Sequence, residues 1–206
     1  MFYTIENNNE TKLIEKKSVF IANLYYIETE EDANLLIKQI EKKYYDAKHH
    51  CFAYRLQNNG DIIERFSDNG EPSGTAGLPI LGILRGKELT NVLVVVTRYF
   101  GGILLGTGGL VRAYSDSTIK ALEQTEYIGK IIGYKVKLCI EYDGLEQLKY
   151  YTNKSNIKIV NIEYLSNIEV TVEMRKEKIE EFTNNNNKKP LKILKYDILE
   201  EKYIDI

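Results

Sequence analysis

Glycine is concentrated in one part of this chain. Ten of the fourteen glycines lie between Ser67 and Asp116. Glycine destabilises ordinary helices and strands, but it permits positive φ angles and a close approach of the backbone to a neighbouring group. A segment this rich in glycine predicts turns and closely packed backbone rather than one continuous helix or strand. It is therefore the first place to look for a binding surface.

Composition limits what the whole chain can be. Its 206 residues are 43% hydrophobic and 28% charged, which suits one large or two small globular domains. No apolar run approaches the ~20 residues that span a bilayer, and residues 1–12 lack the basic and apolar regions of a secretory signal. The two cysteines, Cys51 and Cys139, provide no disulfide framework. The sequence predicts a cytoplasmic protein without a membrane partner.

The net charge of −2 bears on the choice of partner. Proteins that bind nucleic acid usually carry an excess of Lys and Arg on one face or in a tail. This chain has no overall excess, so any binding of nucleic acid must depend on a local basic patch.

Periodicity and turn residues predict an α+β arrangement in the first half. Thr29 precedes three acidic residues and is expected to cap a helix. Ser73, Thr75 and Thr107 are candidate caps of two later helices. The expected elements begin with a strand at 16–27, a helix at 29–45, and a hairpin of 49–56 and 61–67 joined by Gln57-Asn58-Asn59-Gly60. A helix within 73–89 that Pro79 starts or breaks, a strand at 91–100 buried on both faces, and a helix at 110–125 follow.

The second half has a different pattern. Its expected elements, in order, are a strand at 134–142, a helix at 145–154, strands at 157–165 and 168–174, a helix at 175–184 and a strand at 191–199. This β-α-β-β-α-β order is that of the ferredoxin-like fold. The run Asn184–Asn187 is expected to be a loop. The predicted fold class is therefore α+β with two domains, residues 1–132 and 133–206.

Several motifs resemble one known family, the bacterial YigZ and eukaryotic IMPACT family. They are Lys17-Ser18, Phe20-Ile21-Ala22, Ala47 with His49, Cys51 and Ala53-Tyr54, the segment SDNGEPSGTAGLPIL (67–81) and the segment VVVTRYFGGILLGTGGLVRAY (94–114). The resemblance implies a first domain like domain 2 of ribosomal protein S5, a second like the C-terminal module of elongation factor G, and a link to translation. Asn69 departs from the acidic residue usual in the first long motif.

The glycine-rich segment also carries the candidate site. Gly106 to Gly109 lead into an expected helix, and free N–H groups at a helix start attract anions. Arg98 and Arg112 could clamp a phosphate by bidentate contacts. Tyr99 and Phe100 are the best-placed aromatic residues for stacking on single-stranded nucleic acid. The predicted phosphate-reading surface consists of Arg98, Gly101, Gly102, Gly108, Gly109 and Arg112, with Asp68 and Glu71 orienting the arginines and His49 at the margin.

Alternative interpretations of the same residues stay open. The glycines could serve only helix–sheet packing, with Arg98 paired to Asp68 or Glu71 and Cys51 buried near a hydrogen-bonded His49. With two His and two Cys, the chain falls short of the usual zinc ligand sets. The spacing of His49 and Cys51 on a strand does not make them an obvious nucleophile–base pair. No metal ion, cofactor or catalytic residue is predicted.

Three functions follow from these observations. The favoured one is a non-enzymatic protein that binds RNA or a ribosome-associated protein. The second is an enzyme acting on an anionic small molecule in the same cleft. The third is a protein-interaction module in which the glycine motif is only scaffold. The sequence leaves the oligomeric state open.

Overall fold

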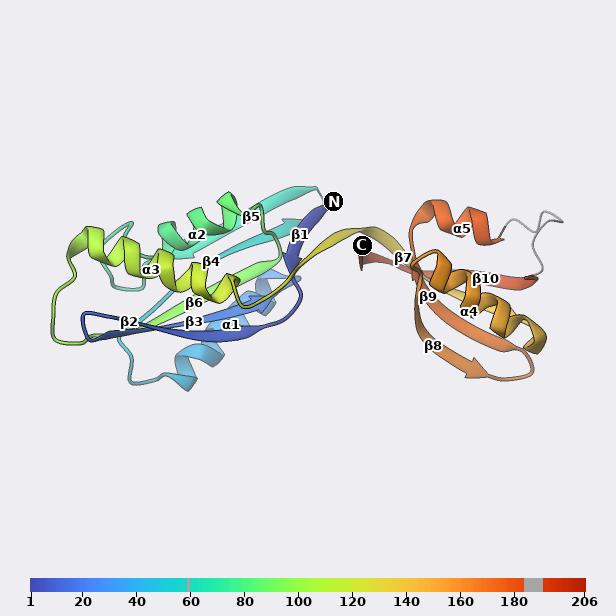
Figure 1. Cartoon of the computed structure of the whole chain (residues 1–206), viewed down its shortest axis with the longest axis horizontal. Coiled ribbons are helices and arrows are strands. Elements are labelled where there is room, and N and C mark those ends of the chain that lie inside the picture. The colour runs from blue at the N-terminus through green and yellow to red at the C-terminus, as the bar shows by residue number, and fades with distance from the viewer. Residues whose placement is uncertain (59, 184–190) are drawn as a thin grey trace. The chain divides into compact units, whose positions relative to one another are not determined.

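The computed structural model describes residues 1–58, 60–183 and 191–206. The chain divides into two compact units, Phe2–Ile128 and Gly129–Ile206, each of which combines a sheet with helices (Figure 1). The α+β class and the two-domain organisation are confirmed. Within the described residues, no helix is long and apolar enough to cross a membrane.

The N-terminal unit is built on an antiparallel five-stranded sheet. The strand order is β2 (Asn9–Glu15), β3 (Ser18–Tyr26), β6 (Val92–Tyr99), β4 (His49–Asn58) and β5 (Asp61–Ser67). The central strand β6 is buried from Val92 to Arg98, as its continuous apolar run predicts. The hairpin of β4 and β5 is also confirmed, although Asn59 lies outside the described residues.

Two N-terminal strands escaped sequence prediction. Strand β1 covers Phe2–Ile5, and β2 forms one edge of the sheet. Only Thr11 of β2 is fully buried. An edge strand with so little buried surface lacks the regular alternation of apolar residues by which strands are recognised.

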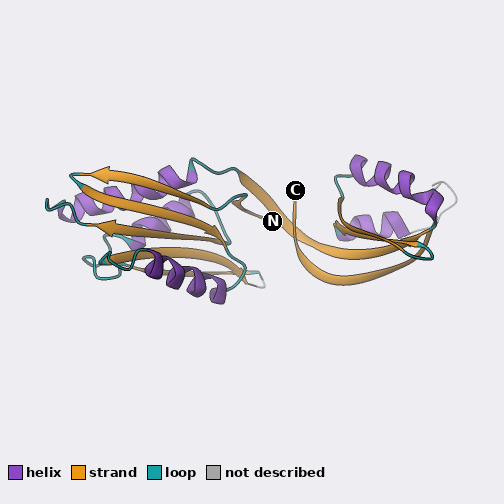
Figure 2. Cartoon of the chain, turned by 90° about the horizontal axis from the view of Figure 1, so that it is seen from below, coloured by secondary structure: helices purple, strands orange, loops and turns teal. Residues whose placement is uncertain are grey.

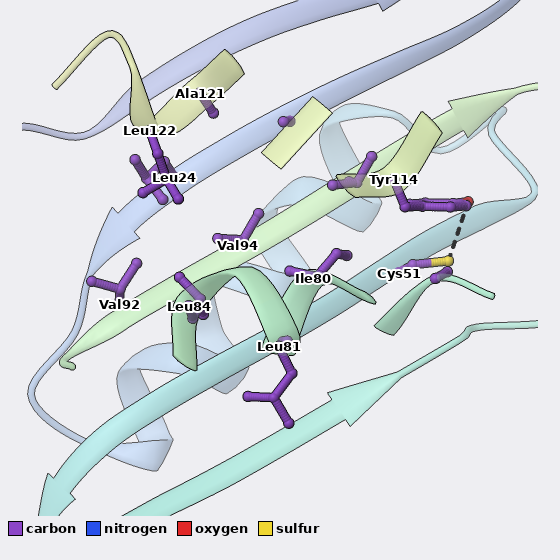
Figure 3. Close-up of a cluster of buried hydrophobic side chains, with 14 of the residues drawn as sticks. Leu24, Cys51, Ile80, Leu81, Leu84, Val92, Val94, Tyr114, Ala121 and Leu122 are labelled. Carbon is purple, nitrogen blue, oxygen red and sulfur yellow. Dashed lines mark hydrogen bonds between the residues drawn. The ribbon is translucent and has the colours of Figure 1, made fainter. Parts of the chain in front are cut away.

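Helices cover both faces of this sheet (Figure 2). Helix α1 (Glu30–Lys43) packs Ala33, Ile37 and Ile40 on one face, and Thr29 forms a capping box with Asp32 as expected of a helix cap. Helices α2 (Gly77–Gly86) and α3 (Gly106–Leu122) pack on the other face, and their apolar side chains meet those of β3, β4 and β6 (Figure 3).

The starts of α2 and α3 correct two expectations. Helix α3 begins at Gly106 rather than at residue 110, so that Thr107 lies inside the helix and the N-cap is Leu105. The N-cap of α2 is Ala76, and neither Ser73 nor Thr75 caps it. Both N-cap residues therefore lack a hydrogen-bonding side chain of their own, although sequence propensity favours one at this position.

The C-terminal unit has the predicted β-α-β-β-α-β order. Its elements are β7 (Tyr127–Ile140), α4 (Leu145–Lys154), β8 (Lys158–Tyr164), β9 (Ile168–Met174), α5 (Lys176–Thr183) and β10 (Ile193–Asp205). The antiparallel strands lie in the order β10-β7-β9-β8, which is the ferredoxin-like arrangement. Apolar residues of β7 and β9 pack with Leu148 of α4 and Phe182 of α5. The expected loop at Asn184–Asn187 lies outside the described residues.

Candidate functional site

The predicted site residues fall into two regions of the N-terminal unit. The first, here called the Asp68 turn, is the segment 67–77 that joins β5 to α2. The Asp68 carboxylate accepts hydrogen bonds from the backbone N–H groups of Gly74, Ala76 and Gly77, at 2.8, 3.0 and 2.9 Å. Asp68 thus satisfies the first N–H groups of α2, which the N-cap residue leaves free. It was expected to orient the arginines, and the structure corrects this because the backbone amides occupy its oxygens.

The Asp68 turn requires glycine at the helix start for a steric reason. A Cβ atom on Gly77 would lie 2.7 Å from the carbonyl oxygen of Ser67. That is shorter than real Cβ contacts, so the backbone approaches itself here as only glycine allows.

Glu71 makes the contact that Asp68 does not. Its Oε1 lies 2.7 Å from Nη1 of Arg98, and the two side chains are only 4% and 7% exposed. The Tyr114 hydroxyl donates to the same oxygen at 2.8 Å. The Arg98 guanidinium also lies 5.5 Å from the ring centre of Phe20 and 5.6 Å from that of Phe100, so that cation–π attraction adds to the ion pair.

This environment changes the expected role of Arg98. Its charge is buried and neutralised by Glu71, whereas Arg112 on α3 is exposed. The two arginines therefore do not present a joint exposed clamp. Breaking a buried ion pair leaves an uncompensated charge, which is strongly unfavourable. Arg98 instead lies between Glu71 and the rings of Phe20 and Phe100.

Titratable side chains of β4 and α3 that pack against the turn also have hydrogen-bond partners. The Cys51 sulfur lies 2.9 Å from the carbonyl oxygen of Asp68 and 3.3 Å from the Tyr114 hydroxyl oxygen. Burial raises the pKa of the Cys51 thiol to about 12 and also raises the pKa of Tyr114, so the thiol remains protonated and unreactive at neutral pH. Half-buried His49 has Nδ1 2.9 Å from the carbonyl oxygen of Asn69. Among the described residues, no three His, Cys, Asp or Glu side chains gather as a metal site would require.

The second region is the segment that leads into α3. We call Phe100, Ile103, Leu104, Gly106, Gly108 and Arg112 the α3 N-terminal surface. Its apolar members are well exposed, with Phe100 at 55%, Ile103 at 42% and Leu104 at 83%. The predicted residue Gly102 is also exposed, and Gly109 is half-buried. Tyr99, the other predicted stacking residue, is turned to Asp46, whose carboxylate accepts from its hydroxyl at 2.6 Å.

Backbone packing fixes the start of this segment. A Cβ atom on Gly101 would lie 2.0 Å from the carbonyl carbon of Lys17. The Gly101 N–H also donates to the Ser18 hydroxyl at 3.2 Å. The segment that follows β6 is therefore pinned against the turn between β2 and β3, while Phe100 and the residues after Gly101 reach solvent.

The positive end of the α3 helix dipole has no acidic side chain in its first turn to offset it. Helix α3 has 17 residues, no side-chain hydrogen bond at its N-cap and no acidic residue in its first turn. The helix dipole places about half a positive charge at such an end. Side chains in a helix lean toward its N-terminus, so exposed Arg112 leans toward the turn at Gly108. Of the residues that the structure describes, none forms an ion pair with Arg112. Sequence reasoning missed Ile103 and Leu104, although two large apolar residues between glycine pairs were a visible signal.

Comparison with known proteins agrees with this architecture. The Impact N-terminal domain matches residues 16–122, and DUF1949, a domain of unknown function, matches residues 138–185. A solved structure of a hypothetical protein superposes with a TM-score of 0.65 at 32% identity, covering 93% of this chain and 95% of that one. The fold and its domains thus define a two-domain protein of the Impact class.

Curated relatives extend the match to most of the chain. IMPACT family member YvyE of Bacillus subtilis is 36% identical over 168 residues, covering 82% of this chain and 77% of the relative. An IMPACT family member of Haemophilus influenzae is 37% identical over 186 residues, covering 90% of each chain. YigZ of Escherichia coli is 37% identical over 169 residues, covering 82% of this chain and 83% of the relative. The chain belongs to the IMPACT family.

Proposed function

We propose that this protein is a non-enzymatic, translation-associated binding protein that binds RNA through the α3 N-terminal surface. The link to translation rests on the resemblance to the IMPACT family, which implies domains like modules of ribosomal protein S5 and elongation factor G. That is an analogy of fold, so the binding itself is argued from the surface.

One observation carries the proposal. One short segment contains the first N–H groups of a long helix, Arg112, and the exposed apolar side chains of Phe100, Ile103 and Leu104. Within the described residues, those N–H groups have no side-chain cap and Arg112 has no ion-pair partner. Helix N-termini and arginine favour phosphate, and apolar side chains favour the faces of bases. No acidic residue occurs from Val92 to Ser115 to oppose an anion. Because Glu71 neutralises Arg98, the local positive charge that a chain of net charge −2 needs comes here from Arg112 and the helix dipole.

The state of the nearby ionisable groups supports binding over catalysis. Asp68 is held by backbone amides, Glu71 by Arg98 and Tyr114, and the Cys51 thiol is buried. A general base or nucleophile must reach its substrate directly, and these groups are committed to the fold.

The test is RNA binding by fluorescence anisotropy over a salt series, with an oligouridine of about 12 nucleotides, within the range of known single-strand site sizes. Arg112→Ala is expected to weaken binding several-fold and to reduce the slope of log affinity against log salt by about 0.7, the value of one phosphate contact to single strands. Arg98 is left unchanged, because its replacement would leave the buried Glu71 carboxylate without its ion-pair partner.

The matched control is Arg65→Ala. Arg65 is an exposed arginine of β5 in the same unit but outside the α3 N-terminal surface, and its replacement should leave binding unchanged. Absence of binding by the wild type at low salt, or equal losses in both variants, would overturn the proposed function.

A further inference from the structure

The turn between β2 and β3 has an unusual sequence for its geometry. Glu15 pairs with Ser18, which leaves Lys16 and Lys17 as a two-residue hairpin loop. Their φ angles are +46° and +66°. Positive φ at both central residues is the geometry of a type I′ turn, for which Asn-Gly is strongly preferred. Lysine has no side-chain hydrogen bond to offset the steric cost of this region.

Residues in such backbone conformations are held there by the surrounding structure and cluster at functional sites. An Asn-Gly pair would suit this backbone better, yet the turn presents two lysines. Both are exposed, and neither forms an ion pair within residues 1–58, 60–183 and 191–206. Of the two acidic residues of β2, Glu10 and Glu15, only Glu15 adjoins the turn.

The turn of Lys16 and Lys17, here called the lysine turn, lies next to the α3 N-terminal surface, and Gly101 connects the two. The Gly101 backbone packs directly on Lys17 and donates to Ser18. Both the turn and the start of α3 lie at the left end of the N-terminal unit in Figure 1.

Helix geometry places Arg112 at the same end of the N-terminal unit as Lys16 and Lys17. Strand β2 and helix α3 run in opposite directions, since the Asn9 side-chain amide donates to the Ala121 carbonyl and the Lys120 ammonium donates to the Lys12 carbonyl. From Lys12 to Lys16 the strand rises about 13 Å. From Lys120 back to Arg112 the helix rises about 12 Å. The cations of the turn and of the helix therefore share one end of the unit.

From this placement we infer that Lys16 and Lys17 complete the RNA surface and that its ligand is single-stranded RNA. This inference rests on the proposed function and deepens it. The three cations Lys16, Lys17 and Arg112 contact phosphates, and Phe100, Ile103 and Leu104 contact bases. Bases present their faces only when they are not stacked in a duplex, so apolar side chains this exposed select single strands.

The deciding variant is Lys16→Asn/Lys17→Gly, because it is expected to change RNA affinity and thermal stability in opposite directions. It removes two charges and introduces the residues that a type I′ turn prefers. We expect the melting temperature to rise while affinity for oligouridine falls several-fold. The salt slope should fall by about 0.7 for each phosphate that the variant no longer neutralises. Lys16→Gln/Lys17→Gln should weaken binding to a similar degree without the gain in melting temperature.

Three further measurements control for net charge and test whether the surface contacts bases. Lys38→Gln/Lys42→Gln removes two exposed charges from α1, on the opposite face of the sheet, and should not alter binding. Leu104→Ala should weaken binding with no change in salt slope, since it removes apolar surface only. An RNA duplex of equal length should bind several-fold more weakly than the single strand.

The outcomes separate this inference from the proposed function. If the lysine variants bind like the wild type while Arg112→Ala does not, the lysine turn is no part of the surface and RNA binding stands. If the duplex binds equally well or more tightly, single-strand selection is wrong. If the wild type binds no RNA at all, the proposed function itself fails.

Discussion

The Asp68 turn and the α3 N-terminal surface are both rich in glycine and both lead into a helix. They differ in whether their polar groups are paired within the protein or exposed to solvent. In the Asp68 turn, a carboxylate satisfies the first N–H groups of α2, and a buried ion pair joins Glu71 to Arg98. At α3 the helix start has no side-chain cap, and Arg112 stands exposed.

The difference teaches that glycine density alone does not identify a binding surface. Glycine allows close packing at Gly77 and at Gly101 alike. Buried polar groups are normally satisfied within the protein, as in the Asp68 turn. Groups that face solvent without partners remain available to a ligand, as at α3.

The largest expected effect comes from breaking the buried pair of the Asp68 turn. Glu71→Ala should lower the free energy of unfolding by about 3–5 kcal/mol, because it leaves the Arg98 charge buried and unpaired. Urea unfolding measures this. The control Glu123→Ala, at the exposed C-terminal end of α3, should cost no more than ~0.5 kcal/mol. Glu71→Leu with Arg98→Met should recover most of the loss, and equal costs for Glu71→Ala and the control would contradict the role of the pair.

A smaller effect is expected from glycines in the α3 region. Gly101→Ala forces a Cβ atom into the Lys17 backbone and should cost roughly 1–3 kcal/mol, as overpacking does. Gly108→Ala meets no atom within 4 Å and should instead stabilise the helix by about 0.5–1 kcal/mol. Thermal and urea unfolding of the two variants compare them directly. Similar effects of the same sign would show that close packing does not distinguish the positions.

The smallest effect concerns pH and His50, which adjoins the Asp68 turn. Its backbone N–H donates to the Asn69 side chain, and its Nδ1 lies 3.1 Å from the Thr97 hydroxyl oxygen. Burial lowers the pKa of His50, with a smaller lowering from His49 that Glu41 opposes. The unfolded chain then binds the proton more readily than the folded one, so stability is lost as the pH falls below about 6.5.

His50→Gln should flatten that part of the stability profile. Unfolding free energies between about pH 5 and pH 7 should show a shallower dependence in the variant, by less than one proton. Parallel profiles for the two proteins would mean that the acid sensitivity comes from other groups.

Much of the fold was predictable because local patterns encode it. Thr29 followed by three acids predicted the start of α1, and the valine run predicted the buried strand β6. The order of elements in the C-terminal unit followed from their periodicity alone. The sequence predictions failed for a strand with little apolar alternation and for helix starts that local residues do not cap. Polar β2 shows little alternation. Asp68, eight residues before the N-cap, satisfies the start of α2 in place of Thr75. At the start of α3, neither Thr107 nor another of the described residues provides a side-chain cap.

The sequence by itself determined the family, the α+β class and the segment that carries the candidate site, since these depend on motifs and periodicities within short stretches of chain. Only the tertiary structure decided which charged residues are available. Arg98 and Arg112 look alike in sequence, but Glu71 and two aromatic rings enclose the first and nothing described pairs with the second. Likewise the backbones of Lys17 and Gly101 meet at one end of the adjacent strands β3 and β6. Burial and pairing between residues distant in the chain arise only on folding, so they are set by the fold and not by any local pattern.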